Sequence, residues 1–550
     1  PAIHRQRRHG PRRSDGRRGR ADLRGRPLIR RTRRRSASLV AAVLLLSACG
    51  AQEPLPSATP SPLPEETASP AATASPTPSP TPVPEVEVPL AVVVTYTAPP
   101  ASITLEELTA GTVVYPCEVT DLSPAFAASR CVPLDEFVEQ IDTPGTIALL
   151  PPDRVVPTMK VLPVGGADLF GGPEVRSVPY PITGHMVGAE PWDAGQIRTL
   201  MSLGDSCPDR GVAFAALTEG RGWDWVFGGG TAEYTRVYAN PVPEGFVGNG
   251  FNIVDAVPTG NEGAVAALVS GADVTLDDFE CPVVNNFTVN DGTVFSIDPA
   301  VLPRLRDTYG VDVATLAANH LFDRGQAGFF ETLQQFADAG IPTAGAGADL
   351  NAALEPAFVE RDGVTFGFVA FNQIVGSTAA APGVPGVAWL TEENITEAVS
   401  RAREEADIVI CVPQWWGGDT PGPGAEYHAT FRGDMRDRQA QMFAAGCDEI
   451  LGHGTHWSGP IEITPDEDGD YHVTMVSHGN FLFGQEWSQQ TQEGVTLELA
   501  FRGTELVQAR MHPYIMLEQA QTNLTDPATD GQYVLTRIYE ASGLCCGAAP

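Results

Sequence analysis

The chain has 550 residues, which is too long for one hydrophobic core and indicates two or three domains. With 43% hydrophobic and 19% charged residues, its composition argues against a wholly disordered chain and against a protein with many membrane spans. The formal net charge is −33, of which residues 1–49 contribute +13, so the remainder carries −46 and would repel nucleic acid and anionic lipid.

Residues 1–49 are typical of a lipoprotein signal peptide with an arginine-rich leader. The apolar stretch 39–46 follows this leader and is much shorter than the roughly 20 residues that span a bilayer. It leads into Leu46-Ser47-Ala48-Cys49-Gly50, which resembles a bacterial lipobox. We therefore expect Cys49 to carry a membrane lipid and to anchor the protein on the outer face of the cytoplasmic membrane, at the cell surface. The alternative is an ordinary signal peptide with an accidental cysteine.

Three composition changes divide the rest of the chain. Residues 50–88 are rich in Pro, Ser and Thr, which predicts a disordered stalk. Short apolar runs between Pro and Gly turns, together with an amphipathic segment at 104–108, predict a small α/β accessory domain over 89–190. Residues 195–515 are interpreted as the main domain and residues 516–550 as a C-terminal tail.

Eight cysteines remain after Cys49, an even number that is compatible with disulfides outside the cytoplasm. Cys117 and Cys131 are close enough in sequence to close a local loop. Cys207 and Cys281 each follow a predicted strand that carries a candidate site residue, so we predict a bridge between them. The absence of a CxxC motif disfavours a structural zinc site.

From about residue 197 onward, apolar strand-like segments alternate with helical ones, which predicts a layered α/β domain with a largely parallel core. Predicted strands cover 198–204, 274–279, 311–317, 364–371, 406–412 and 449–452, and predicted helices cover 326–339, 392–405 and 438–445. Later segments at 461–463, 471–477, 495–501 and 506–511 have a period of two and predict antiparallel strands on one side of the sheet.

Polar side chains follow these strands in order, at the carboxyl ends where α/β sheets bind ligands. Carboxylate, amide and imidazole groups in such a series are the ligands that hold one or two divalent metals for hydrolysis. Singly, each has a structural alternative, such as a turn for Asp205, a helix cap for Asn319, or packing for His478, Trp415 and Trp416. The residues of the series are Asp205, Asp278, Glu280, Asn319, His320, Gln414, His453, His456 and Asn480.

The order of these motifs resembles the bacterial capsule synthesis protein CapA family, which includes poly-gamma-glutamate capsule biosynthesis proteins and is related in fold to calcineurin-like metallophosphoesterases. The motifs are Gly204-Asp205, Asp278-Phe279-Glu280, Ala318-Asn319-His320 with Asp323, Glu426-Tyr427, Gly452-His453 with His456, and Gly479-Asn480-Phe481.

The resemblance implies a metallophosphoesterase-like αββα sandwich and a divalent metal, manganese or zinc. The implied metal ligands are Asp205, Asp278, Glu280, Asn319, His320, His453 and His456. His320 and His456 would be catalytic, and the implied substrate contacts are Arg210, Gln414, Glu426 and Asn480.

Several positions depart from the family pattern. Gln414 stands where many members have a histidine, and Gly454 stands where many have a second imidazole. Asp278 replaces the usual asparagine, and no histidine follows Asp205 at the spacing of ordinary metallophosphoesterases. These departures argue against a complete dinuclear site.

Two functions remain open at this point. The first is a metal-dependent hydrolase or transferase that acts on a surface polymer or a phosphoester. The second is a non-catalytic lipoprotein scaffold that binds or exports an anionic capsule polymer or its precursor, together with membrane-bound capsule synthesis proteins. An acidic domain would need cations or arginines to bind such a polymer, and the candidates are Arg210, Arg324, Arg432, Arg436 and Arg438.

Overall fold

The computed structural model describes residues 85–126, 129–134, 137, 141, 143, 145–240, 251–289, 292–416 and 427–544. These residues all belong to one unit, because the chain divides after Ser79. The predicted signal peptide, the lipid on Cys49 and the stalk as far as residue 84 lie outside the described residues and stay predictions. Glu426, Cys545 and Cys546 also lie outside them.

The accessory domain contains a three-stranded and a five-stranded sheet. Its first strand begins at Glu85, inside the segment that the sequence assigned to the stalk, because alternating Val86 and Val88 turn inward and Val88 is buried. Its first helix begins after Thr104, which forms a capping box with Glu107. The elements are β1 (Glu85–Pro89), β2 (Ala91–Thr95), α1 (Leu105–Ala110), β3 (Val113–Pro116), β4 (Val119–Thr120), β5 (Arg130–Val132), β6 (Ile147–Leu150), β7 (Met159–Leu162), α3 (Pro173–Arg176) and β8 (Thr183–Val187).

Two arginines bind the accessory domain to the main domain. Arg176 donates from Nη1 and Nη2 to the two oxygens of Asp273, at 2.7 and 2.9 Å. Arg510 donates from Nη1 to Asp168 Oδ2 at 2.6 Å and lies 3.3 Å from Glu498 Oε2. Removing one partner of such a buried pair leaves an uncompensated charge, so these contacts hold the two domains firmly together.

The main domain contains two large sheets and one two-stranded sheet, β15 with β18. Its strands are β9 (Ile197–Cys207), β10 (Thr231–Asn240), β11 (Phe251–Gly260), β12 (Val274–Phe279), β13 (Val313–Thr315), β14 (Thr343–Ala344), β15 (Ala346–Gly347), β16 (Ala357–Arg361), β17 (Val364–Asn372), β18 (Gly386–Val387), β19 (Ile408–Gln414), β20 (Glu449–Leu451), β21 (Ile461–Pro465), β22 (Tyr471–Met475), β23 (Asn480–Phe483), β24 (Glu493–Arg502), β25 (Glu505–Leu517) and β26 (Gln521–Leu524). Its helices are α4 (Arg210–Ala213), α5 (Trp223–Val226), α6 (Ala264–Val269), α7 (Val301–Asp307), α8 (Gly325–Ala339), α9 (Leu350–Ala353), α10 (Glu392–Arg403), α11 (Gly433–Ala445), α12 (Gln489–Gln492) and α13 (Gln532–Ala541).

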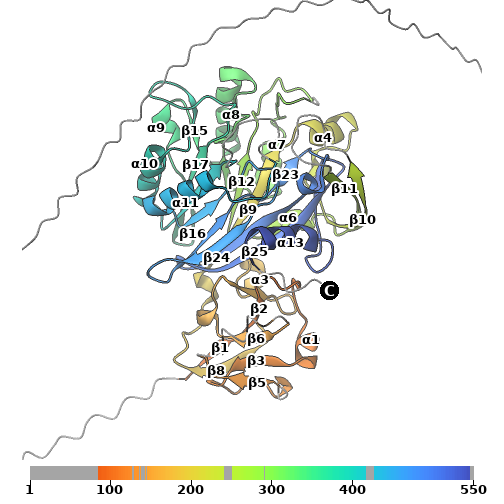
Figure 1. Ribbon diagram of the computed structural model, residues 1–550, viewed down its shortest axis with the longest axis vertical. Coiled ribbons are helices and arrows are strands. Elements are labelled where there is room, and N and C mark those ends of the chain that lie inside the picture. The colour runs from red at the N-terminus through yellow and green to blue at the C-terminus, as the bar shows by residue number, and fades with distance from the viewer. Residues whose placement is uncertain are drawn as a thin grey trace, which may run out of the picture. The chain divides into compact units, whose positions relative to one another are not determined.

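The larger sheet has the strand order β11-β10-β26-β25-β24-β9-β12-β13-β14, with β23 beside β9, and the second sheet has the order β16-β17-β19-β20-β22-β21. Side chains alternate between the two faces of each sheet. On β12, Leu276 joins Phe368 in the core between the sheets, whereas Phe279 packs on Phe336 of α8 at a ring distance of 5.2 Å. Helices α10 and α11 cover the outer face of the second sheet (Figure 1). The layers therefore run helix, sheet, sheet, helix, and the predicted α/β class is confirmed.

The segment predicted as a C-terminal tail belongs to the main domain over its described part. Strand β26 pairs with β25 and lies between β25 and β10 in the larger sheet. Helix α13 buries Val534, Leu535 and Ile538, because these residues recur at helical spacing on one face. The hairpin of β10 and β11 was also not predicted from the sequence. No helix in the described part of the chain combines the length and apolarity that a membrane span requires.

The six cysteines in the described part of the chain form three disulfides. Cys117 is joined to Cys131, and Cys207 is joined to Cys281, which confirms the predicted bridge at the strand ends. The third joins Cys411 on β19 to Cys447 after α11, a pairing that the sequence did not suggest.

Candidate metal centre

The predicted site residues converge because their strands are neighbours. Asp205 near the end of β9 pairs in register with Asp278 on β12 and with Asn480 on β23. Because β12 and β23 both run parallel to β9, Asn480, the first residue of β23, lies beside Asp205 and Asp278 near the carboxyl ends of β9 and β12. Glu280 directly follows β12, and His453 follows β20 in the second sheet. The centre therefore lies where the two sheets meet at their carboxyl edges.

Two groups of buried side chains share Asp205. In the first, His453 Nδ1 donates to Asp205 Oδ1 at 2.9 Å and lies 3.8 Å from Asp278 Oδ2. In the second, Asp205 joins Glu280 and His456, with His456 Nδ1 3.3 Å from Asp205 Oδ2. The potential ligand atoms of each group lie within 4.8 Å of one another. Both groups are present even though the histidine expected at position 414 is a glutamine.

Four polar atoms in these groups are buried without a hydrogen-bond partner: Asp205 Oδ2, Asp278 Oδ2, Glu280 Oε2 and His453 Nε2. Leaving such an atom unsatisfied costs roughly 1–3 kcal/mol. A divalent cation would satisfy these atoms, and carboxylates combined with imidazoles suit such an ion. The residues therefore fit a divalent metal.

Burial and mutual repulsion set the ionisation of the carboxylates. Burial disfavours a charge on Asp205, but the imidazoles of His453 and His456 outweigh it and hold the pKa of Asp205 well below its usual value. Burial and the charge of Asp205 raise the pKa of Asp278 to about 6 and the pKa of Glu280 to about 7. Asp205 is thus the carboxylate that stays ionised over the widest pH range.

Neighbouring side chains orient the candidate ligands. Thr315 donates from Oγ1 to Asp278 Oδ1 at 2.6 Å, and Gln414 donates from Nε2 to Glu280 Oε1 at 3.0 Å. His478 stacks on His453 at a ring distance of 4.8 Å and bonds to the carbonyl oxygen of Gly452. This supports the structural interpretation of His478. Thr315 carried no signal in the sequence, because a threonine inside a strand is ordinary.

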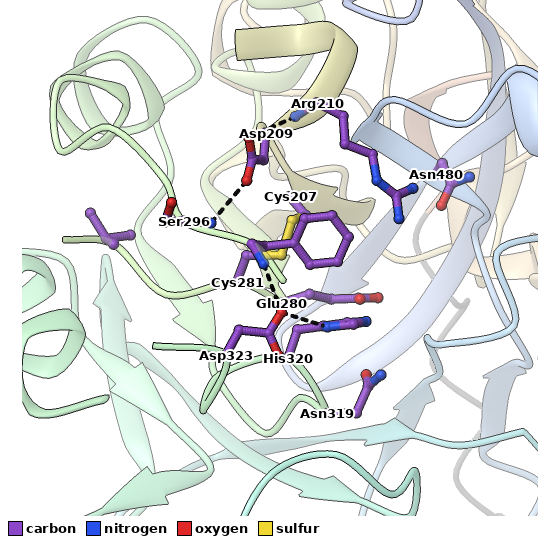
Figure 2. Close-up of a disulfide and its surroundings, with 12 residues drawn as sticks. Cys207, Asp209, Arg210, Glu280, Cys281, Ser296, Asn319, His320, Asp323 and Asn480 are labelled. Carbon is purple, nitrogen blue, oxygen red and sulfur yellow. Dashed lines mark hydrogen bonds and ion pairs between the residues drawn. A yellow bond between two sulfur atoms is a disulfide. The ribbon is translucent and has the colours of Figure 1, made fainter. Parts of the chain in front are cut away.

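His320 and Asn319 lie beside the two groups. His320 donates from Nδ1 to Asp323 Oδ2 at 3.0 Å (Figure 2). The same oxygen accepts the backbone N–H of Phe295. Asn319 Oδ1 lies 3.4 Å from Gln414 Nε2. His320 is not a member of either acid–imidazole group, although the sequence predicted it as a ligand.

Asp277 lies on the opposite face of β12 from Asp278 and was not among the predicted site residues. Ser206 donates to its Oδ1 at 2.7 Å, and its Oδ2 is buried without a partner. Burial, together with the charge of Asp278, raises the pKa of Asp277 to about 7.

We expect Asp277→Asn to remove a pH-dependent loss of stability. Folding raises the pKa of Asp277, so the wild type is stabilised relative to higher pH when Asp277 is protonated in both states, below about pH 4. As the pH rises from there to about 7, the free energy of unfolding of the wild type falls by roughly 1.4 kcal/mol per pH unit. Urea unfolding should therefore give equal stability for the variant and the wild type near pH 4 and a more stable variant at pH 8. A constant difference across this range would contradict the assignment.

These features define a mixed α/β protein with a buried acid–imidazole centre at the carboxyl ends of its central strands. Residues 199–485, more than half of the chain, match the family described as bacterial capsule synthesis protein PGA_cap. The chain belongs to this family, which confirms the resemblance drawn from the motifs.

Curated relatives include a PGA biosynthesis protein CapA from Bacillus subtilis, 30% identical over 41% of this chain and 57% of the relative. A probable polyglutamine synthesis accessory protein from Mycobacterium tuberculosis is 32% identical over 36% of this chain and 54% of the relative. The chain thus spans about half the length of the curated relatives it matches. Among solved structures, NAD nucleotidase from Haemophilus influenzae aligns with a TM-score of 0.32 and 10% identity, over 58% of this chain and 50% of that chain.

Proposed function

We propose that this protein acts in the biogenesis of a poly-gamma-glutamate capsule, as a metal-dependent hydrolase of a phosphoester or of the polymer. The family and the names of the curated relatives support the pathway. The observation that carries the enzymatic proposal is the pair of buried ligand groups that share Asp205. The helix–sheet–sheet–helix layering is also what a metallophosphoesterase-like fold requires.

The ligand groups indicate how the site would work. Asp205, Asp278 and His453 would hold a cation, with Glu280 and His456 completing the second group. We propose manganese or zinc, since both accept mixed carboxylate and imidazole ligands. A divalent cation supplies charge stabilisation and Lewis acidity when bound.

His320 is the best-placed general acid. His320 Nδ1 keeps its proton and donates a hydrogen bond to Asp323 Oδ2, so the Nε2 atom is left to exchange a proton with the leaving group. His456 is less suitable, because it belongs to a ligand group and its Nδ1 donates to Asn480 Oδ1 at 2.8 Å. The sequence predicted Gln414 and Asn480 as substrate contacts. We propose that Gln414 also orients Glu280 and that Asn480 also orients His456.

One observation favours the alternative, a scaffold that binds polymer without catalysis. Gln414 donates its amide to Glu280, so a neutral side chain ties up one oxygen of a candidate ligand. In that function, bound cations would bridge the acidic centre to the carboxylates of the polymer, and membrane-bound capsule synthesis proteins would be its partners.

Two measurements on the purified protein distinguish the hydrolase from the scaffold: metal analysis, followed by phosphodiester and gamma-glutamyl hydrolysis assays. We expect bound manganese or zinc, hydrolysis of one substrate class, and a rate about 10²- to 10⁴-fold lower in His320→Ala. The metal content of that variant should match the wild type, because His320 lies outside both groups. Bound metal without hydrolysis of either substrate would support the scaffold.

We also propose that the lipid on Cys49 keeps the protein at the cell surface. Cys49→Ser should release the protein from the membrane fraction of its host or stall its processing, because serine cannot accept a thioether-linked lipid. Fractionation and immunoblotting would measure this. A variant that stays membrane-bound and normally processed would rule out the anchor.

A further inference from the structure

Arg210 stands beside the metal centre on a backbone that is fixed from several sides. It follows Asp209 three residues after Cys207 and has a φ of +46°, in the left-handed region that non-glycine residues rarely adopt. The buried carboxylate of Asp209 accepts the backbone N–H of Arg210 at 2.8 Å and the backbone N–H of Ser296 at 2.9 Å (Figure 2). The Cys207–Cys281 bridge holds the start of the same turn. The position of Arg210 is therefore set by the fold.

The guanidinium itself is held at one edge and one face. Its Nε donates to the carbonyl oxygen of Gly292 at 2.8 Å, and its Cζ lies 4.6 Å from the ring centroid of Phe295 and 5.8 Å from that of Phe483. No hydrogen bond or ion pair to any residue in the described part of the chain involves its Nη1 or Nη2. The two terminal nitrogens thus form an oriented fork that has no partner among the described residues.

This arrangement is unusual because carboxylates are close. Arg210 lies within electrostatic range of Glu280 and Asp323, yet it forms no ion pair with either. An arginine near acidic groups normally turns its fork onto one of them. Here the Gly292 carbonyl and the Phe295 ring hold the side chain away, so the fork is available for another anion.

Arg436 provides a contrast within the same chain. Its Cζ lies 3.9 Å from the ring centroid of Phe431, but its Nη1 and Nη2 donate to the two oxygens of Glu462 at 2.8 and 2.6 Å. Both arginines stack on an aromatic ring, and only in Arg436 is the fork occupied. The sequence placed Arg436 among the candidate polymer-binding arginines, but Glu462 occupies its fork, so we no longer treat it as a binding residue and use it as a matched control for Arg210.

We propose that Arg210 binds an oxyanion of the substrate and thereby selects anionic substrates at the metal centre. A planar guanidinium fork pairs with the two oxygens of a phosphate or a carboxylate. The proposal rests on the proposed function, since the carboxylates of the centre must be neutralised by cations before an anion can approach. The same chemistry is offered by a phosphoester and by the side-chain carboxylates of poly-gamma-glutamate.

Calorimetric titration of the full chain tests this, first with Mn²⁺ and then, in excess Mn²⁺, with inorganic phosphate and with the dipeptide gamma-glutamyl-glutamate. We expect one of the anions to bind, which identifies the source of the oxyanion. Arg210→Gln should weaken that binding about tenfold or more, with Mn²⁺ affinity unchanged. Arg210→Lys keeps the charge but lacks the fork, so its anion affinity should lie between those of the wild type and Arg210→Gln. The anion affinity of Arg436→Gln should match that of the wild type.

The outcomes distinguish this inference from the proposed function. Failure of the wild type to bind Mn²⁺ overturns the metal-dependent function, whereas anion binding that is lost in Arg210→Gln still supports the role of Arg210. Anion binding that is equal in Arg210→Gln, Arg210→Lys and the wild type overturns the inference, and so does the absence of binding of both anions to the wild type. Equal melting temperatures of the variants would show that the lost affinity is not a loss of folding.

Discussion

Replacing Asp205 by asparagine is expected to abolish the rise in melting temperature that manganese or zinc gives the wild-type protein. Asp205 belongs to both ligand groups, so no second carboxylate can take its place. Its pKa lies well below its usual value because His453 and His456 outweigh burial, so it is ionised and able to bind a cation at neutral pH. At a hundredfold excess over the dissociation constant, a bound cation stabilises the folded state by about 2.7 kcal/mol.

Asp277→Asn is the matched control for this experiment. Asp277 is also buried and lies on β12 next to Asp278, but it points to the opposite face of the sheet and belongs to neither group. Differential scanning fluorimetry with and without cation should show a full thermal response in Asp277→Asn and none in Asp205→Asn. Because Asp205→Asn also lowers the stability of the metal-free protein, the quantity to compare is the rise and not the starting temperature. Equal rises in the two variants would contradict a centre built on Asp205.

Removing the bridge between Cys207 and Cys281 is expected to lower both stability and metal affinity. The bridge spans a sequence separation of 74 residues, for which loop-closure entropy gives about 4 kcal/mol. Cys207 lies two residues after Asp205, and Cys281 directly follows Glu280, so the bridge fixes two strand ends that carry ligands (Figure 2). The repelling carboxylates would otherwise be free to move apart before the cation binds. We expect the double variant Cys207→Ala, Cys281→Ala to bind manganese roughly tenfold more weakly.

The bridge between Cys117 and Cys131 offers a direct comparison. It lies in the accessory domain and spans a sequence separation of 14 residues, so its removal should cost about 3 kcal/mol in stability. Manganese affinity in that variant should equal that of the wild type. Urea unfolding and calorimetric titration measure the two quantities separately. If both double variants bound manganese like the wild type, the Cys207–Cys281 bridge would stabilise the fold without positioning the site.

The amino-acid sequence alone determined the family, the α/β class and the residues of the two buried acid–imidazole groups, although it also predicted Asn319 and His320 as ligands, and these lie outside both groups. These predictions succeeded because the pattern is local: an apolar strand followed by a polar side chain at its carboxyl end recurs at Asp205, Asp278 and His453. Parallel strands have their carboxyl ends at the same edge of a sheet, so residues at the ends of neighbouring strands lie near one another. The bridge between Cys207 and Cys281 followed from the same reasoning.

The tertiary structure decided the features that depend on long-range pairing. The position of β26 between β10 and β25 could not be read from the sequence, because strand order depends on partners far away in the chain and not on local composition. Contacts between distant segments likewise set the partner of Gln414, the hydrogen bond of Asp277 to Ser206, and the orientation of the Arg210 guanidinium. The sequence identifies the polar side chains of the site. Only their packing shows which of them already have hydrogen-bond partners in the protein and which can bind a cation or an anion.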